Sequence, residues 1–68
     1  MQTFKIESEY IQLIQLLKAA RLAQSGGEAQ QLVVDGLIKV NGVTESRKRA
    51  KLRVGDVVEY KNNSIKIE

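Results

Sequence analysis

Five cationic side chains lie close together in one short stretch of the sequence, and their spacing is suited to binding anions. The stretch holds five of the eleven lysines and arginines of this 68-residue chain: Arg47, Lys48, Arg49, Lys51 and Arg53. Guanidinium and ammonium groups bind phosphate oxygens through charge-assisted hydrogen bonds. The whole chain has a net charge of only +3, so the remaining residues are mildly acidic and the basic charge forms one patch. This distribution predicts an electrostatic footprint for a polyphosphate.

An extended conformation would sort this segment, which we term the basic ribbon (residues 47–53), into two faces. Side chains of a strand alternate, so the odd-numbered cations from Arg47 to Arg53 would share one face. The even-numbered residues from Ala50 to Val54 are apolar and would face a core. A helix would give a much poorer apolar stripe, so the extended conformation is favoured. The alternative is a solvated loop, which is the usual state of a charge run.

Residue types that the sequence lacks exclude several kinds of chemistry. The chain has no cysteine and no histidine, so it offers no disulfide, thiol nucleophile, imidazole base or Cys/His metal site. It has neither a glycine-rich phosphate loop nor a dinucleotide fingerprint, and its carboxylates do not pair convincingly. We therefore expect no catalysis, no cofactor and no small-molecule substrate. No long apolar run or targeting peptide is recognisable, which predicts a cytoplasmic protein without membrane contact.

Two helices are predicted in the N-terminal half of the chain. Apolar residues recur every three or four positions from Tyr10 to about Ala23, the spacing of an amphipathic helix, and Ser8 can cap its start. A second helix is predicted over residues 25–35. Its serine is followed three residues later by Glu28 in a capping box, and Gly36 supplies a left-handed terminator.

The other elements are predicted to be short strands. Alternating apolar residues predict three of them, over residues 3–6, 57–61 and 64–67. Within residues 37–44, Asn41-Gly42 predicts a hairpin, because a type I′ turn needs positive φ at both central residues. Gly55-Asp56 marks a further turn. The pattern predicts an α+β fold in which a helix-turn-helix-like pair packs on a small, mostly antiparallel sheet. Residues 1–68 are expected to form a single domain.

The placement of charge on the helical pair bears on its function. A helix-turn-helix protein reads the major groove of DNA with its second helix, but here no lysine or arginine occurs between Gly26 and Asp35. Lys18 and Arg21 lie instead on one flank of the first helix. Cations there and on the basic ribbon suit a protein that contacts phosphates and shape, which is the usual way of recognising structured RNA.

Two further features each allow two interpretations. Backbone N–H groups at the Ser25-Gly26-Gly27 turn could attract a phosphate, and the glycines would let it approach closely. A well-capped tight turn is the favoured interpretation, because the Glu28 carboxylate can cover the same amides. Tyr10 and Tyr60 could stack on bases, although packing at the edge of the core is favoured for both.

Taken together, these segments resemble the S-four domain, the RNA-binding module of small-subunit ribosomal protein four, which is also called the α-L motif. The resemblance covers about residues 10–60. It rests on LLK at 16–18, SGGEA at 25–29, GLIKVNG at 36–42, ESRKR at 45–49 and GD at 55–56. Each segment is common by itself, whereas the combination is specific. Within the superfamily, the chain is most similar to small stand-alone bacterial members that are thought to act with ribosomes.

The resemblance implies a partner and a set of site residues. The partner would be structured RNA, in particular ribosomal RNA or the ribosome, held by the helical pair and the basic loop beyond the hairpin. A monomer is expected. The implied RNA-binding residues, with Arg53 added from the alternation of the basic ribbon, are Lys18, Arg21, Ser25, Gly26, Gly27, Gln30, Arg47, Lys48, Arg49, Lys51 and Arg53.

The sequence departs from the family pattern at two places. Gln30 stands where a basic residue is common, and residues 10–12 lack the basic residue that is usual near the start of the first helix. Both departures place more of the expected binding on the basic ribbon. Two alternatives remain open, namely a protein-interaction module that docks an acidic partner and a DNA-binding accessory module that uses the same patch.

Overall fold

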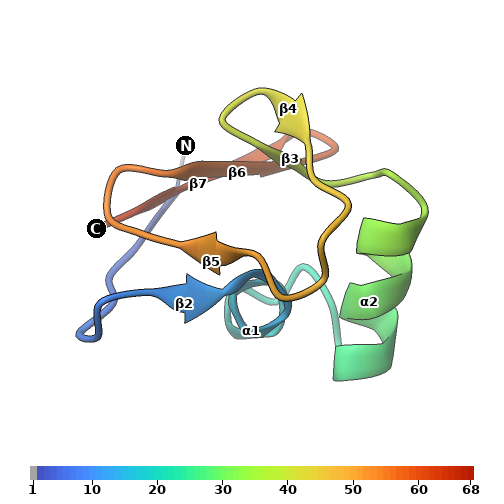
Figure 1. Cartoon of the computed structure of the whole chain (residues 1–68), viewed down its shortest axis with the longest axis horizontal. Coiled ribbons are helices and arrows are strands. Elements are labelled where there is room, and N and C mark those ends of the chain that lie inside the picture. Colours follow the sequence, from blue (N-terminus) through green and yellow to red (C-terminus); the bar gives the residue numbers. More distant parts are fainter. Residues whose placement is uncertain (1) are drawn as a thin grey trace.

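The computed structural model describes residues 2–68, and Figure 1 shows a sheet on one side of the molecule with the helices on the other. Its elements in chain order are β1 (Gln2–Phe4), β2 (Ile11–Gln12), α1 (Leu13–Ala19), α2 (Gly26–Val34), β3 (Lys39–Val40), β4 (Val43–Thr44), β5 (Lys51–Leu52), β6 (Val57–Tyr60) and β7 (Asn63–Ile67). Over residues 2–68, none of the helices combines the length and apolar character needed to cross a lipid bilayer.

The strands form two separate sheets. Five of them follow the order β1-β7-β6-β3-β4, and every neighbouring pair is antiparallel except β1 with β7. The other two, β2 and β5, form an antiparallel ladder of their own. The predicted α+β fold, with two helices on a small and mostly antiparallel sheet, is confirmed.

One apolar cluster joins the helices, the larger sheet and the basic ribbon. Its members are Leu13, Leu16, Leu17, Ala23, Ala29, Val33, Ile38, Ala50, Leu52, Val58, Ile65 and Ile67. In β7 the buried Ile65 and Ile67 alternate with the exposed Lys66, so one face of the sheet covers this core and the other faces solvent. Burial of Ala50 and Leu52 ties the basic ribbon to the same core.

The first helix is shorter than the predicted span from Tyr10 to Ala23, and Ser8 does not cap it. The residues expected to form its first turn belong to β2, which pairs with β5. The N–H of Leu13 then donates to the carbonyl of Ala50 at 2.9 Å, and the Ser8 hydroxyl donates to the carbonyl of Tyr10. Strand pairing thus satisfies the backbone here and overrides the helical periodicity, as tertiary contacts often do.

The second helix and the hairpin form where they were predicted, but only the Ser25 half of the predicted capping box is present in residues 2–68. The Ser25 hydroxyl accepts a hydrogen bond from the N–H of Glu28 at 3.1 Å, and Gly36 adopts φ +73° after the last turn of α2. Asn41 and Gly42 have φ values of 53° and 83°, as a type I′ turn requires. The boundaries of the strands differ by one or two residues from the predicted ones: β1 begins and ends earlier, and β3 begins only at Lys39.

Only part of the basic ribbon is a strand. Before β5 the chain makes a turn in which the N–H of Ala50 donates to the carbonyl of Arg47. Ala50 and Leu52 are buried as predicted, but Val54 is 67% exposed, so its expected inward position is wrong. The reason is a tight turn immediately after β5, with Gly55 at φ +99°, which places Val54 at its outer corner.

A polar cluster links this turn to the hairpin. The carboxylate of Asp56 accepts hydrogen bonds from the N–H of Arg53 at 2.8 Å and from the side-chain amide of Asn41 at 3.0 Å. The amide oxygen of Asn41 in turn accepts from the N–H of Val57 at 2.9 Å. Asn41 and Asp56 therefore do more than form turns, because together they fix the C-terminal end of the basic ribbon against the sheet.

Candidate functional site

The β2–β5 ladder has an apolar side and a polar side. Ile11 is registered opposite Leu52, and this pair lies toward the core. Their neighbours along each strand point the other way, so Tyr10, Lys51 and Arg53 share the outward side. The ladder therefore places Lys51 and Arg53 on one exposed side, whereas Arg47 and Arg49 lie in the loop and turn before it, so the predicted single face of four cations forms only in part.

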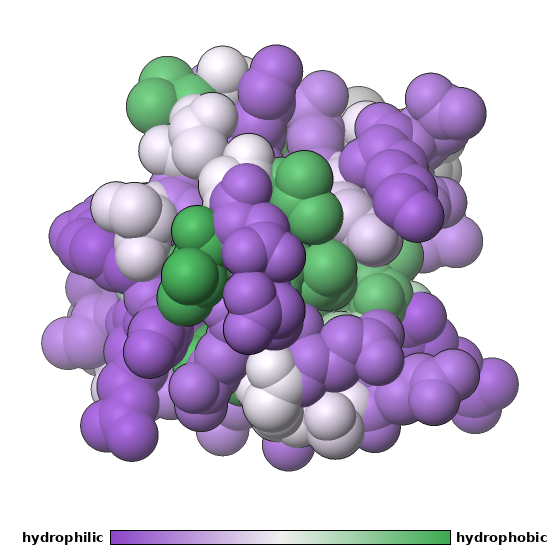
Figure 2. All heavy atoms as spheres, turned by 90° about the vertical axis from the view of Figure 1, so that its right-hand side faces the viewer, coloured by the Kyte–Doolittle hydropathy of each residue, from purple (hydrophilic) through white to green (hydrophobic). Residues whose placement is uncertain are grey.

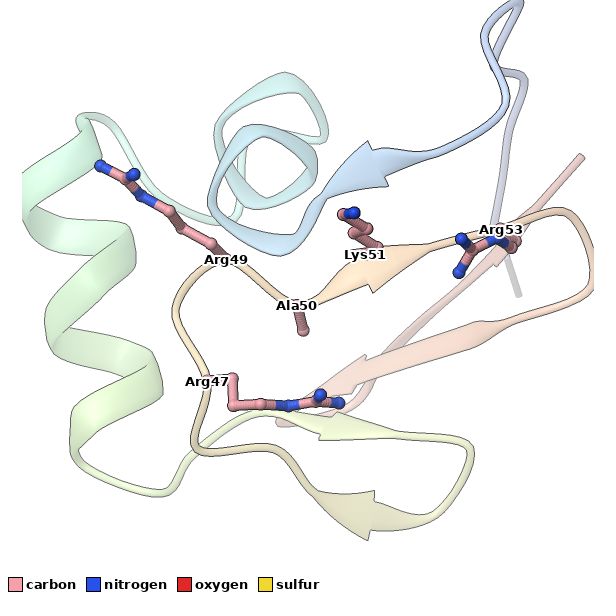
Figure 3. A pocket seen from close by; sticks show the side chains of 5 residues that line it. All are labelled: Arg47, Arg49, Ala50, Lys51 and Arg53. Carbon is pink, nitrogen blue, oxygen red and sulfur yellow. The ribbon is translucent and has the colours of Figure 1, made fainter.

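Four of the five cations of the basic ribbon surround an open concavity of about 510 Å³ (Figure 3). They are Arg47, Arg49, Lys51 and Arg53, and Ala50 also lines the concavity. In the view of Figure 3, Arg49 extends toward the end at which α2 begins, whereas Arg47 points the opposite way. Lys48 is exposed in the turn but does not line the concavity. The ribbon thus surrounds this concavity with cations that diverge rather than lie parallel.

Arg47 is partly neutralised by a neighbour. Its N–H, Nε and Nη2 donate to the Glu45 carboxylate at 3.0, 3.1 and 3.1 Å. These side-chain hydrogen bonds lower the pKa of Glu45 and raise the pKa of Arg47. Within residues 2–68 this is the one contact between opposite charges closer than 4.0 Å. Arg49, Lys51 and Arg53 therefore keep their full charge available for a ligand.

The helical pair adds Lys18 and Arg21, both exposed. The N–H of Leu22 donates to the carbonyl of Leu17 at 2.9 Å, and the N–H of Arg21 donates to that of Lys18 at 3.0 Å. This is the pattern of a Schellman motif, in which the residue after the helix adopts a left-handed conformation and is usually glycine. Here that residue is Arg21, with φ +62°. Such a conformation costs a residue with a Cβ roughly 1–2 kcal/mol.

The first turn of α2 contains two glycines that the fold does not require. Neither Gly26 nor Gly27 has positive φ, and a Cβ added at Gly26 would meet no atom within 4 Å. At Gly27 the nearest atom would be the Ser25 hydroxyl, at an ordinary 3.9 Å. A glycine inside a helix costs roughly 1 kcal/mol relative to alanine. Open backbone at this turn is therefore a feature that packing alone leaves unexplained.

The helix α2 itself is polar but carries no cation. Figure 2 shows polar side chains over most of the side of the molecule on which α2 lies, with apolar atoms between them. Gln30 is exposed on α2, and a hydrogen bond joins the side chains of Gln31 and Asp35 at 2.8 Å. Val34, at the end of the helix, is 59% exposed. The helix that would enter a DNA groove thus presents no lysine or arginine.

The two tyrosines differ in their surroundings. Tyr60 is half-buried and packs against the core, as predicted. Tyr10 is 36% exposed, and the Nζ atom of Lys51 lies 4.9 Å from the centre of its ring. The expectation that Tyr10 packs at the core edge is wrong, because Tyr10 precedes a strand of the ladder rather than lying on the apolar stripe of a helix.

Sequence reasoning misplaced Tyr10 and missed the contact of Glu45, although each left a signal. Gln12 is the residue just before α1, and the side chain of Gln15, three positions after Gln12, accepts a hydrogen bond from its N–H at 3.3 Å. That signal would have placed Tyr10 outside the helix. Glu45 lies two residues before Arg47, the separation at which a carboxylate in a loop can reach both the backbone and the side chain.

The fold described here is that of the α-L motif. The solution structure of Escherichia coli YbcJ, described as revealing a "recently discovered alfaL motif involved in RNA-binding", matches this chain with a TM-score of 0.75 at 32% identity. The match covers 98% of this chain and 86% of that one. The sequence profile of the S4 domain matches residues 4–68. The chain therefore belongs to the S4 domain family, as the sequence resemblance predicted.

Two relatives show how widely the similarity extends. The chain is 32% identical over 68 residues to the Escherichia coli (strain K12) protein named "Putative RNA-binding protein YbcJ", and the match covers 98% of this chain and 97% of the relative. It is 44% identical over 54 residues to the Bacillus subtilis (strain 168) protein named "Probable ribosome maturation protein RlbA". That match covers 79% of this chain and 76% of the relative.

The contact between Glu45 and Arg47 yields a testable prediction. In an Arg47→Gln variant, the carboxylate loses a cationic donor, so the pKa of Glu45 should rise toward its ordinary value. In the native protein the contact should persist as pH falls through the ordinary titration range of glutamate and break only below it. A carbon-detected NMR titration of the Glu45 carboxyl group measures both. Identical midpoints in the two proteins would contradict the contact.

Proposed function

We propose that this protein is a non-catalytic RNA-binding domain spanning residues 1–68, which binds structured RNA through its phosphates. The observation that carries the proposal is the set of three cations, Arg49, Lys51 and Arg53, that have no carboxylate partner within residues 2–68 and lie around one concavity beside a ladder fixed to the core. Membership of the S4 domain family and the RNA-binding description of YbcJ support it. Lys18, Arg21 and the Ser25–Gly27 turn form the other part of the proposed site.

Phosphates are the fitting ligand for this surface because its cations are exposed and divergent. Exposed cations gain little from a single anion in water. A folded RNA brings several phosphates at once, and release of its counterions drives binding. Since α2 offers no cation to a major groove, irregular RNA that presents its backbone to an open concavity fits better than a DNA duplex.

Ribosomal RNA is the RNA that we propose. The Bacillus subtilis relative carries ribosome maturation in its name, and the sequence resemblance implies the same partner. In this proposal a monomer acts in the cytoplasm on ribosomal RNA or on the ribosome itself. The second candidate is an accessory module in which the same patch docks an acidic protein or DNA, because exposed arginines also pair with carboxylates.

Salt dependence tests the proposal. About four to six phosphate contacts should give a slope of about −3 to −5 for log affinity against log salt, since each contributes roughly −0.7 to −0.9. Fluorescence anisotropy with a folded ribosomal RNA fragment measures the slope. Replacing Arg49, Lys51 and Arg53 with glutamine should weaken binding and reduce the slope by about 2 to 3.

The matched control removes the same charge elsewhere. Lys5, Lys39 and Lys66 are exposed, and the last two lie on the face of the sheet that is turned away from the core. Their replacement by glutamine should leave most of the affinity and slope intact. Equal losses in the two triple variants would mean that binding follows net charge rather than a site. Tighter binding of duplex DNA or of an acidic protein than of folded RNA would favour the second candidate.

Arg21 allows stability and binding to be separated. An Arg21→Gly variant relieves the left-handed strain, so we expect its free energy of unfolding to rise by about 0.5–1 kcal/mol, after allowance for the greater entropy of unfolded glycine. RNA affinity should fall nevertheless, because a phosphate contact is lost. Urea denaturation and anisotropy measure the two effects. If the variant is more stable and binds RNA as tightly as the native protein, Arg21 does not contact the RNA.

A further inference from the structure

Tyr10 is the aromatic residue that is not packed against the core. The chain has three aromatic residues, all within the described range, and Phe4 and Tyr60 pack against the core. Tyr10 instead lies just before β2 and is 36% exposed. A single exposed apolar side chain is common on protein surfaces. The surroundings of this ring are what set it apart.

The ring of Tyr10 lies beside a cation of the basic ribbon. The ammonium of Lys51 lies 4.9 Å from its centre, and Lys51 also lines the concavity. The register of the β2–β5 ladder, in which Ile11 faces Leu52, sets Tyr10 across from Arg53 when it is extended by one residue. An aromatic face with one cation over it, and a second cation on the residue across the ladder, matches the two parts of a nucleotide, a flat base and its phosphates.

We propose that Tyr10 is a stacking site for an unpaired nucleobase, and that Lys51 and Arg53 hold the phosphates next to that base. This inference rests on the proposed function, because it requires that the cationic face binds RNA. Bases within a duplex are already stacked on both faces and cannot reach the ring. The surface would therefore select RNA in which a single-stranded nucleotide lies beside the phosphates that the ribbon contacts.

The contact between Lys51 and the ring allows base stacking and phosphate binding to occur at the same place. An exposed cation over an aromatic ring is held weakly and can be exchanged. When a base stacks on Tyr10, the ammonium can move the short distance to a phosphate oxygen of the same nucleotide. Lys51 is thus the residue that connects aromatic and electrostatic recognition.

An experiment with two RNAs separates the contribution of the bases to affinity from that of the phosphate backbone. The first is a hairpin with a single-stranded loop of adenosines, and the second is the same hairpin with abasic sites in the loop, which keeps every phosphate. The native protein should bind the first about tenfold more tightly. Tyr10→Leu and Tyr10→Thr, two variants without a ring, should lower the ratio of the two affinities to near one. Both should bind the abasic hairpin as the native protein does. Tyr10→Phe should retain the ratio.

Tyr60→Leu is the matched control. Tyr60 also has a lysine over its ring, with Lys61 Nζ at 5.2 Å, but it lies at the turn between β6 and β7. This variant should keep the native ratio, and circular dichroism reports the fold of every variant. If the Tyr10 variants lacking a ring bind RNA with the native ratio, stacking is overturned while the proposed function stands. If the native protein binds neither hairpin, both the proposed function and this inference fail.

Discussion

The hydrogen bond from the N–H of Leu13 to the carbonyl of Ala50, together with the two-stranded ladder that it adjoins, is the constraint on which the rest of the site depends. It begins α1, ends the turn of the basic ribbon and places Ala50 and Leu52 in the core. A cluster of cations repels itself and would otherwise spread into solvent. Burial of the apolar residues between them offsets that repulsion and holds the charges on one side.

Several local features near the cationic surface lower the stability of the fold. Arg21 takes a conformation that suits glycine, and two glycines open the first turn of α2 although packing does not demand them. Glu45 acts in the opposite direction, because it neutralises Arg47 and orders the loop through the backbone. Residues that break a local rule without benefit to the fold are expected mainly at functional sites. Here they occur around the proposed RNA-binding face.

Much of the fold could be predicted because its signals are local. The Ser25 cap, the Gly36 terminator and the Asn41-Gly42 turn each satisfy a backbone requirement within a few residues. The start of α1 was harder to predict, because residues 10–12 share the helical pattern and Ile11–Gln12 form a strand only when β5 is beside them. Tyr10 was misplaced for the same reason.

The site residues were predicted with similar limits. The charge of the basic ribbon is visible in the sequence, but the pairing of Arg47 with Glu45 and the outward turn at Val54 depend on loop geometry that alternation does not describe. The link between Asn41 and Asp56 joins two turns that are far apart in the chain. It could be recognised only after both turns were placed on the same sheet.

The most direct test of the central claim is an amide NMR titration of the native protein with a folded ribosomal RNA fragment. If the ladder presents the proposed site, the largest shifts will fall on residues 10–12, 18–27 and 47–53. The outer face of the sheet, which carries Lys39 and Lys66, will change little. Shifts concentrated on that outer face, with the ladder unaffected, would contradict the proposed site.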